Sequence, residues 1–134
     1  PFETLEARPM DFGHWSAHRL ESMSDYQLSH GAAVAIGVAL DSIYSHHRLG
    51  FPKEDMLLVC ETLKRLGLEL WHPLLERRDA LLQGVEEFRE HLGGRLTLTM
   101  LQAIGQPVDV HQLELPILHR SIDDLRDLVS IQKR

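Results

Sequence analysis

The most informative segment of the chain runs from Asp11 to Ala35 and reads DFGHWSAHRLESMSDYQLSHGAAVA. It holds three histidines, His14, His18 and His30, gathered around the expected starts of two helices. The second helix is apolar on nearly every side. Imidazoles collected beside a buried helix are unusual, so this stretch predicts both the centre of the core and a site next to it.

The rest of the chain is organised around that buried helix, which we expect over residues 30–48. Apolar residues at helical spacing also predict helices over 13–23, 52–66 and 74–92, the last with interruptions at 77–78 and at Gly84. Leucines alternating with threonines predict a strand over 95–101, and a second strand at 108–111 completes a β-hairpin. Ser121 and Asp124 resemble a capping box that starts the final helix.

These elements predict a mainly α fold, a multi-helix domain with one small β-hairpin. The 134 residues suit a single domain over 1–134. A net charge of −6 argues against general nucleic-acid binding and against attraction to anionic lipid, so we expect neither a nucleic-acid nor a membrane partner. The one cysteine, Cys60, cannot form an internal disulfide; we expect it to be buried, and the protein to be cytoplasmic.

The three histidines of the opening stretch have the chemistry of metal ligands. His14 and His18 are four residues apart, which places them on one face of a helix. His30 stands at a helix N-terminus, where the partial positive charge disfavours an imidazolium and favours the neutral form that binds metal. The glycines Gly13 and Gly31 adjoin two of the three histidines, where close backbone approach can matter.

A catalytic zinc site usually has three protein ligands and a water. Either His18 is the third ligand, or a carboxylate outside this chain supplies it. We interpret the other histidines as structural residues: His46, His47, His72, His91, His111 and His119.

Two sequence blocks carry a family resemblance. GHWSAH at 13–18, followed by HGAAVAIG at 30–37, resembles the GHxxGH…HGEAVAxG signature of dehydroquinate synthase and related sugar phosphate cyclases. The spacing of the blocks agrees with that family. The tail LTLTMLQAIGQPVDV at 96–110 is similar to the family's late hairpin. The resemblance extends from about Asp11 to Val110.

The resemblance implies a two-domain protein with a Rossmann-like NAD domain followed by a helical metal domain. This chain would be a C-terminal fragment that lacks the NAD-binding domain, so we expect it to be inactive alone. The implied cofactors are Zn²⁺ or Co²⁺, together with NAD held mainly by the other domain. The implied partner is a sugar phosphate substrate, and we expect a homodimer in the cytoplasm.

The family's functional residues map onto this chain one by one. The resemblance implies that His14 and His30 are metal ligands, with a glutamate upstream of Pro1 as the third. His18 matches a histidine near the substrate phosphate and carboxylate, which gives it a catalytic role. Three further residues would bind substrate: Asp11 in place of an asparagine, Arg8 one residue from a family arginine, and Arg89 near a late lysine.

The implied reaction begins with transient oxidation of a secondary alcohol by NAD. The ketone acidifies the adjacent C–H, phosphate is eliminated and the ketone is reduced again. Ring opening and an intramolecular aldol then close a carbocycle, with the metal as Lewis acid. The resemblance thus implies a carbon–oxygen lyase acting on a heptulose phosphate.

Three departures from the family pattern bear on the substrate. Ala32 stands where the family has a glutamate, Asp11 replaces an asparagine, and 88–90 replaces an Asp-Lys-Lys segment. They fit a divergent cyclase for another sugar phosphate, or a protein that has lost activity. Two other functions remain open at this point: an iron- or zinc-dependent alcohol dehydrogenase-like domain, and a non-catalytic helical binding module.

Overall fold

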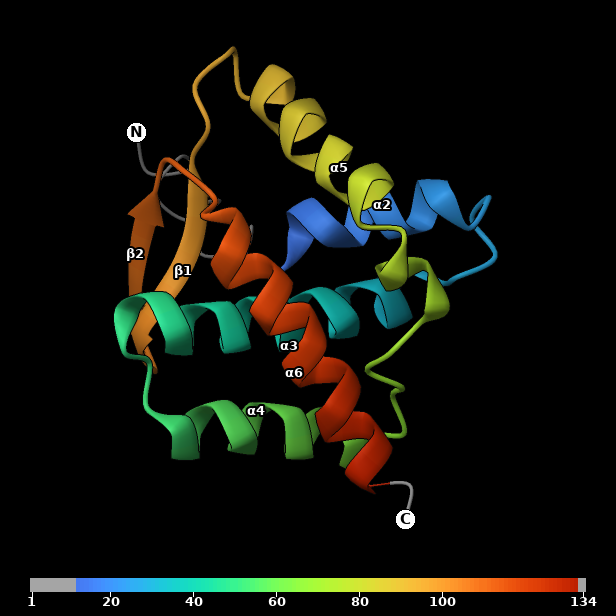
Figure 1. Ribbon diagram of the computed structural model, residues 1–134, viewed down its shortest axis with the longest axis vertical. Helices are drawn as coiled ribbons and strands as arrows, with labels where there is room; N and C mark the ends of the chain where they lie inside the picture. The colour runs from blue at the N-terminus through green and yellow to red at the C-terminus, as the bar shows by residue number, and fades with distance from the viewer. Residues whose placement is uncertain (1–11, 133–134) are drawn as a thin grey trace.

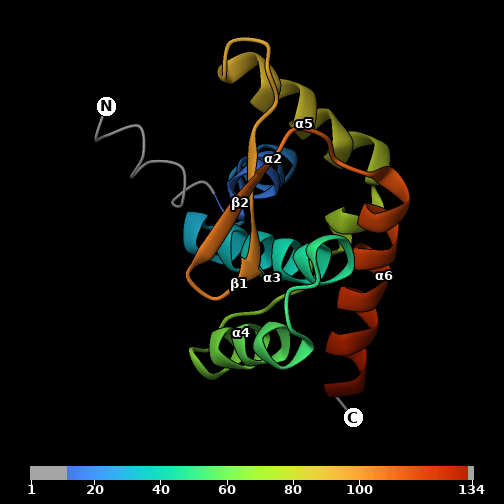
Figure 2. The same ribbon diagram turned by 90° about the vertical axis from the view of Figure 1, so that its left-hand side faces the viewer.

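The computed structural model describes residues 12–132, and the long helix α3 (His30–Leu49) lies at its centre. Figure 1 shows α2 (His14–Met23) on one side of α3 and α4 (Lys53–Arg65) on the other. Helix α6 (Leu115–Gln132) crosses α3, and α5 (Arg78–His91) covers α2. The view turned by 90° shows the same stack end-on, with α6 along one flank (Figure 2). The prediction of a mainly helical domain is therefore confirmed.

Helix α3 is central because its sequence leaves no polar stripe along most of its length. Its middle is buried on all sides, and its largest apolar side chains, Ile36, Leu40 and Ile43, are at most 2% exposed. Ser29 caps its start, with the Ser29 side chain accepting a hydrogen bond from the Ala32 N–H. Gly50 ends it in the left-handed conformation, as helix C-termini commonly do.

The hairpin lies at one end of α3 and pairs β1 (Leu98–Ala103) with β2 (Gln106–Val110) in antiparallel register. Leu98 faces Val110 in that register. Buried Met100 closes the core on this side. Both strands start and end within a few residues of the predicted ranges, although Thr99 is buried along with its neighbours Leu98 and Met100.

The segment over 74–92 is broken at one of its two expected interruptions. A 3₁₀ turn at Pro73–Glu76 precedes α5, so the break at Arg77 is confirmed. Gly84 does not interrupt the helix. A Cβ at this position would lie 2.8 Å from Cβ of Arg19, so the glycine allows α5 and α2 to pack closely.

The capping box predicted at Ser121 is wrong. Helix α6 begins at Leu115, and Ser121 lies within it, donating its hydroxyl to the Ile117 carbonyl at 2.7 Å. Pro116 is tolerated because the first turn of a helix needs no N–H from it. Because α6 starts at Leu115 rather than at Ser121, buried Leu118 joins the apolar stripe that packs on α3.

Cys60 is 1% exposed in the core, as predicted, and burial raises the pKa of its thiol to about 11. Across residues 12–132, no helix combines the length and the apolar character needed to cross a membrane.

Candidate metal centre

The fold brings the three histidines of the opening stretch together. The ring centroids of His14 and His18 lie 5.8 Å apart, those of His14 and His30 5.9 Å, and those of His18 and His30 6.3 Å. The first two are neighbours on α2, as their spacing predicts. His30 reaches them from the first residue of α3, which packs along α2 in the opposite direction, so that Gly13 lies on Gly37, two turns into α3.

A glycine contact sets how closely the start of α2 approaches α3. Gly13 precedes His14 in a left-handed conformation with φ of 79°, and its carbonyl packs on Gly37 of α3. A Cβ at Gly37 would lie 2.0 Å from that carbonyl oxygen, which no packing tolerates. The two glycines therefore allow α2 and α3 to pack more closely than larger residues would.

Hydrogen bonds at Nδ1 orient two of the rings. His14 Nδ1 lies 3.3 Å from the Phe12 carbonyl oxygen, and His30 Nδ1 lies 2.9 Å from a carboxylate oxygen of Glu21. With Nδ1 donating to these acceptors, each ring carries its lone pair on Nε2. This arrangement is common for metal-bound histidine, where a carbonyl or carboxylate holds the second nitrogen.

Glu21 is a site residue that the sequence analysis missed. Its other oxygen lies 3.5 Å from His18 Nδ1, so one carboxylate serves two rings. The Glu21 side chain is 13% exposed, against 64% for His18 and 59% for His30. Its position three residues after His18 and seven after His14 places it on the same helical face, a signal that could have identified it.

The histidines fit part of a zinc site. Two imidazoles that share one tetrahedral ion have ring centroids roughly 5 Å apart, and the observed 5.9 Å between His14 and His30 is within a small side-chain adjustment of that. Within residues 12–132, no group of three or more His, Cys, Asp or Glu side chains is arranged to hold an ion unaided. The pair therefore fits a centre that takes a further ligand from elsewhere.

A buried carboxyl lies beneath the histidines. Asp41 on α3 is 1% exposed and accepts hydrogen bonds from the Gly13 N–H at 2.9 Å and from the Trp15 indole N–H at 3.1 Å. Burial raises the pKa of Asp41 to about 7, although both hydrogen bonds act in the opposite direction. The sequence analysis missed this residue because an aspartate late in an apolar helix carries no local signal of its partners.

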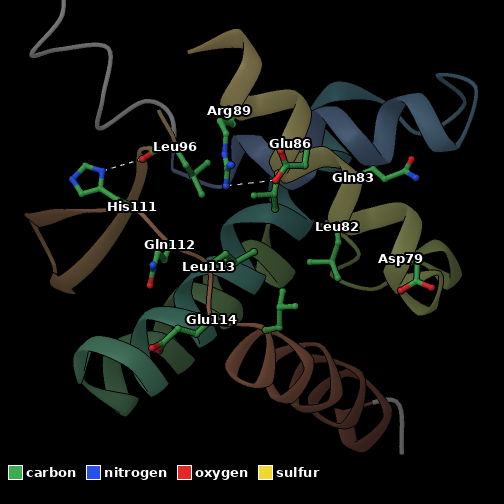
Figure 3. A pocket seen from close by; sticks show the side chains of 12 residues that line it. Asp79, Leu82, Gln83, Glu86, Arg89, Leu96, His111, Gln112, Leu113 and Glu114 are labelled. Carbon is green, nitrogen blue, oxygen red and sulfur yellow. Dashed lines mark hydrogen bonds and ion pairs between the residues drawn. The ribbon is translucent and has the colours of Figure 1, made fainter. Parts of the chain in front are cut away.

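The remaining predicted substrate residues lie apart from the histidines or outside the described part of the chain. Arg89 lies on α5 beside Glu86, at 3.5 Å, and lines a cavity of about 540 Å³ (Figure 3). His111 lines the same cavity and bonds the Leu96 carbonyl, whereas none of the three clustered histidines lines it. Asp11 and Arg8 lie outside residues 12–132, so their roles stay predictions, as does that of Arg89.

Other histidines make structural contacts, as the sequence analysis predicted. His46 bonds the Phe51 carbonyl at 2.8 Å, where the chain leaves α3. His47 bonds Asp124 of α6 at 2.6 Å, and His72 caps the 3₁₀ turn through the Leu74 N–H. Nδ1 of His119 lies 3.1 Å from a guanidinium nitrogen of Arg78.

Comparison with known proteins identifies the family. The family model for the 3-dehydroquinate synthase C-terminal domain matches residues 1–90. A 3-dehydroquinate synthase of Latilactobacillus sakei is 33% identical over 116 residues, covering 86% of this chain and 30% of that protein. The chain belongs to the 3-dehydroquinate synthase family of sugar phosphate cyclases. The resemblance read from the two histidine blocks is confirmed.

The matches also include proteins named 2-epi-5-epi-valiolone synthase rather than 3-dehydroquinate synthase. A 2-epi-5-epi-valiolone synthase of Actinomyces is 30% identical over 121 residues, covering 90% of this chain and 32% of that protein. A solved 2-epi-5-epi-valiolone synthase from Streptomyces hygroscopicus, with NAD⁺ and Zn²⁺ bound, superposes with a TM-score of 0.82 at 25% identity. That match covers 88% of this chain and 32% of the other. This chain spans about a third of the length of the curated relatives it matches.

Proposed function

We propose that this domain supplies the metal-binding half of a metal- and NAD-dependent sugar phosphate cyclase. The observation that carries the proposal is the meeting of His14, His18 and His30, from two helix starts, with a hydrogen-bonded Nδ1 on the two proposed ligands. Membership of a family of cyclases supports it, as does the Zn²⁺ bound in the solved relative from Streptomyces hygroscopicus.

His14 and His30 would hold Zn²⁺, or Co²⁺, through Nε2, with a third ligand from outside this chain. Such an ion would polarise substrate hydroxyl oxygens, while NAD, held mainly by another domain, would accept and return a hydride. His18 makes only a 3.5 Å contact with Glu21 and is the most exposed of the three, so it is the ring most accessible to the phosphate. Glu21 holds the rings of His30 and His18 in place.

One residue of this chain argues for a substrate with less negative charge than the family's usual one. Asp11 stands where the family has an asparagine, and a carboxylate there repels a substrate carboxylate. We therefore propose a heptulose phosphate without a carboxylate as substrate. The valiolone synthases among the relatives support a divergence within the family.

The proposed reaction balances without net redox change. When bound, NAD would take a hydride from a secondary alcohol carbon and give it back to the ketone, so phosphate would accumulate and NADH would not. Between these two events the adjacent carbon would lose a proton and phosphate would depart with the C–O electron pair. We propose that the working enzyme is a homodimer of the two-domain protein, and that this chain alone is inactive.

The test uses the full-length protein with NAD and Zn²⁺. Phosphate release would be followed with a heptulose phosphate and with its carboxylate-bearing counterpart, and the carbocycle identified by mass spectrometry. We expect release from the first substrate at least tenfold faster than from the second. His14→Ala and His30→Ala should each abolish stoichiometric zinc and turnover, while His46→Ala, in a structural contact, should retain both.

Three results would each contradict a part of the proposal. Net NADH formation without phosphate release would indicate an alcohol dehydrogenase-like enzyme instead. Full zinc content in both His14→Ala and His30→Ala would show that these rings are not ligands. Faster turnover of the carboxylate-bearing sugar would overturn the substrate assignment and leave the metal site intact.

A further inference from the structure

Asp41 accepts hydrogen bonds from the turn that leads into α2, the helix that carries His14 and His18. It lies in the second half of α3, yet its two carboxylate oxygens accept from the backbone N–H of Gly13 and the indole N–H of Trp15. These two donors stand on either side of His14 in the sequence. The carboxyl therefore fixes the backbone on which the His14 ring is carried.

The same turn is held from a second direction. Gly37, one helical turn before Asp41, receives the carbonyl of Gly13 against its bare Cα. Residue 13 thus has its N–H bound by Asp41 and its C=O seated on Gly37. The main chain entering His14 has little freedom to shift relative to α3, which also carries His30.

The carboxyl is costly to bury. It is 1% exposed, and desolvation raises its pKa to about 7 despite two hydrogen bonds. A buried ionisable group is often replaceable by an apolar one without loss of stability. Its two partners, in contrast, would be left as buried donors without an acceptor if it were removed.

We propose that Asp41 is a positioning residue for the metal site, holding residues 13–15 so that the His14 ring meets His30 at the distance an ion requires. This inference rests on the proposed function, because it assumes that His14 is a ligand. Partners that orient a ligand from behind typically change metal affinity 10- to 100-fold when altered. Asp41 acts one step further back, through the backbone, so we expect the lower end of that range.

The experiment compares Asp41→Asn with Ser42→Ala in the full-length protein. Asparagine keeps the shape of aspartate but has one acceptor oxygen, so one of the two donors faces an NH₂ group. Ser42 is equally buried on the same helix, and its hydroxyl has no partner among the described residues, so its removal perturbs the core without touching the turn. Zinc affinity of the apo protein is measured by chelator competition, and thermal unfolding in parallel.

We expect Asp41→Asn to weaken zinc binding about tenfold and Ser42→Ala to leave it within about twofold. Loss of thermal stability in Asp41→Asn with zinc affinity unchanged would overturn the proposal, since the carboxyl would then be structural only. If Asp41→Asn does not fold, Trp15→Phe decides, because it removes one donor and keeps an aromatic ring. Weaker zinc binding in it supports the proposal, and unchanged binding overturns it.

His14→Ala is measured alongside these variants and separates the two hypotheses. If it leaves zinc affinity unchanged, the metal site itself is wrong and Asp41 has nothing to position. If it abolishes binding while Asp41→Asn has no effect, the metal site stands and the positioning role fails.

Discussion

Two groups of histidines in this molecule lie close together in space, and they differ in how their ring nitrogens are bonded. His14, His18 and His30 converge with ring centroids 5.8–6.3 Å apart, while His46 and His47 lie with centroids 5.0 Å apart at the other end of α3. In the first group Nδ1 of two rings faces a carbonyl or a carboxylate and Nε2 is left for a ligand. In the second, His47 uses Nε2 to bind Asp124 of α6. His46 keeps its Nε2 as well, because its Nδ1 bonds the Phe51 carbonyl, so the difference is that the two rings of this pair do not both offer Nε2 to one ion.

The largest effect should come from adding one methyl group at Gly37, where the start of α2 packs on α3. Gly37→Ala places a Cβ 2.0 Å from the Gly13 carbonyl oxygen, so α2 must move away from α3. We expect a loss of about 3 kcal/mol or more in unfolding free energy, measured by urea denaturation, and loss of zinc binding.

Gly31→Ala is the matched control for this change. It lies in the same helix with nothing within 4 Å of the added Cβ, so it should be neutral or stabilising by about 0.5–1 kcal/mol. Equal behaviour of the two variants would show that the glycine contact does not set the approach of the helices.

The second prediction concerns pH. Aspartate ordinarily has a pKa of 3.8, and burial raises that of Asp41 to about 7, so its contribution favours folding below pH 4 and is lost as the pH rises through 7. Between pH 5 and pH 8 the loss is on the order of 2–3 kcal/mol, at about 1.4 kcal/mol per pH unit up to the pKa of about 7. Tyr44, on the same helix, titrates above this window because burial raises its pKa from 10.0.

The measurement is the unfolding free energy of the apo protein at pH 5 and pH 8, for the wild type and for Asp41→Asn. The difference between the two proteins isolates this carboxyl from the other titrating groups. A wild-type stability that falls no more steeply than that of Asp41→Asn would refute the assignment.

A third, smaller effect tests the orientation of the rings. Glu21→Gln replaces a carboxylate that accepts from His30 with an amide whose donor can face the ring instead. We expect zinc affinity to fall about tenfold, or 1.4 kcal/mol, by chelator competition. Glu61→Gln, whose carboxylate pairs with Arg65 on α4, should bind zinc like the wild type. Unchanged affinity in Glu21→Gln would remove this residue from the site.

The smallest effect should come from the second histidine group. Asp124→Asn weakens the bond between α6 and His47, a pair in which the aspartate side chain is 44% exposed. We expect a loss of about 0.5–1 kcal/mol in unfolding free energy and no change in zinc affinity. A fall in zinc affinity here would erase the distinction between the two groups.

The sequence was sufficient to predict the elements whose signals are local. Helices starting at His14 and His30 and the hairpin follow from periodicity and from the residues at their ends. The start of α6 was misplaced because the Ser121 motif is a local signal, whereas burial of Leu118 against α3 is a tertiary one. The two histidine blocks carried enough information for the family, because their residue types and spacing are tied to the chemistry.

The helical period makes residues three and four apart neighbours, so the sequence was enough to show which rings share a helix face. It could not determine that His30, sixteen residues from His14, lies 5.9 Å from it. That distance depends on how closely two helices pack, which Gly13 and Gly37 decide together. Asp41 likewise gains its role only from Gly13 and Trp15, because a buried carboxyl must find its donors wherever the fold brings them.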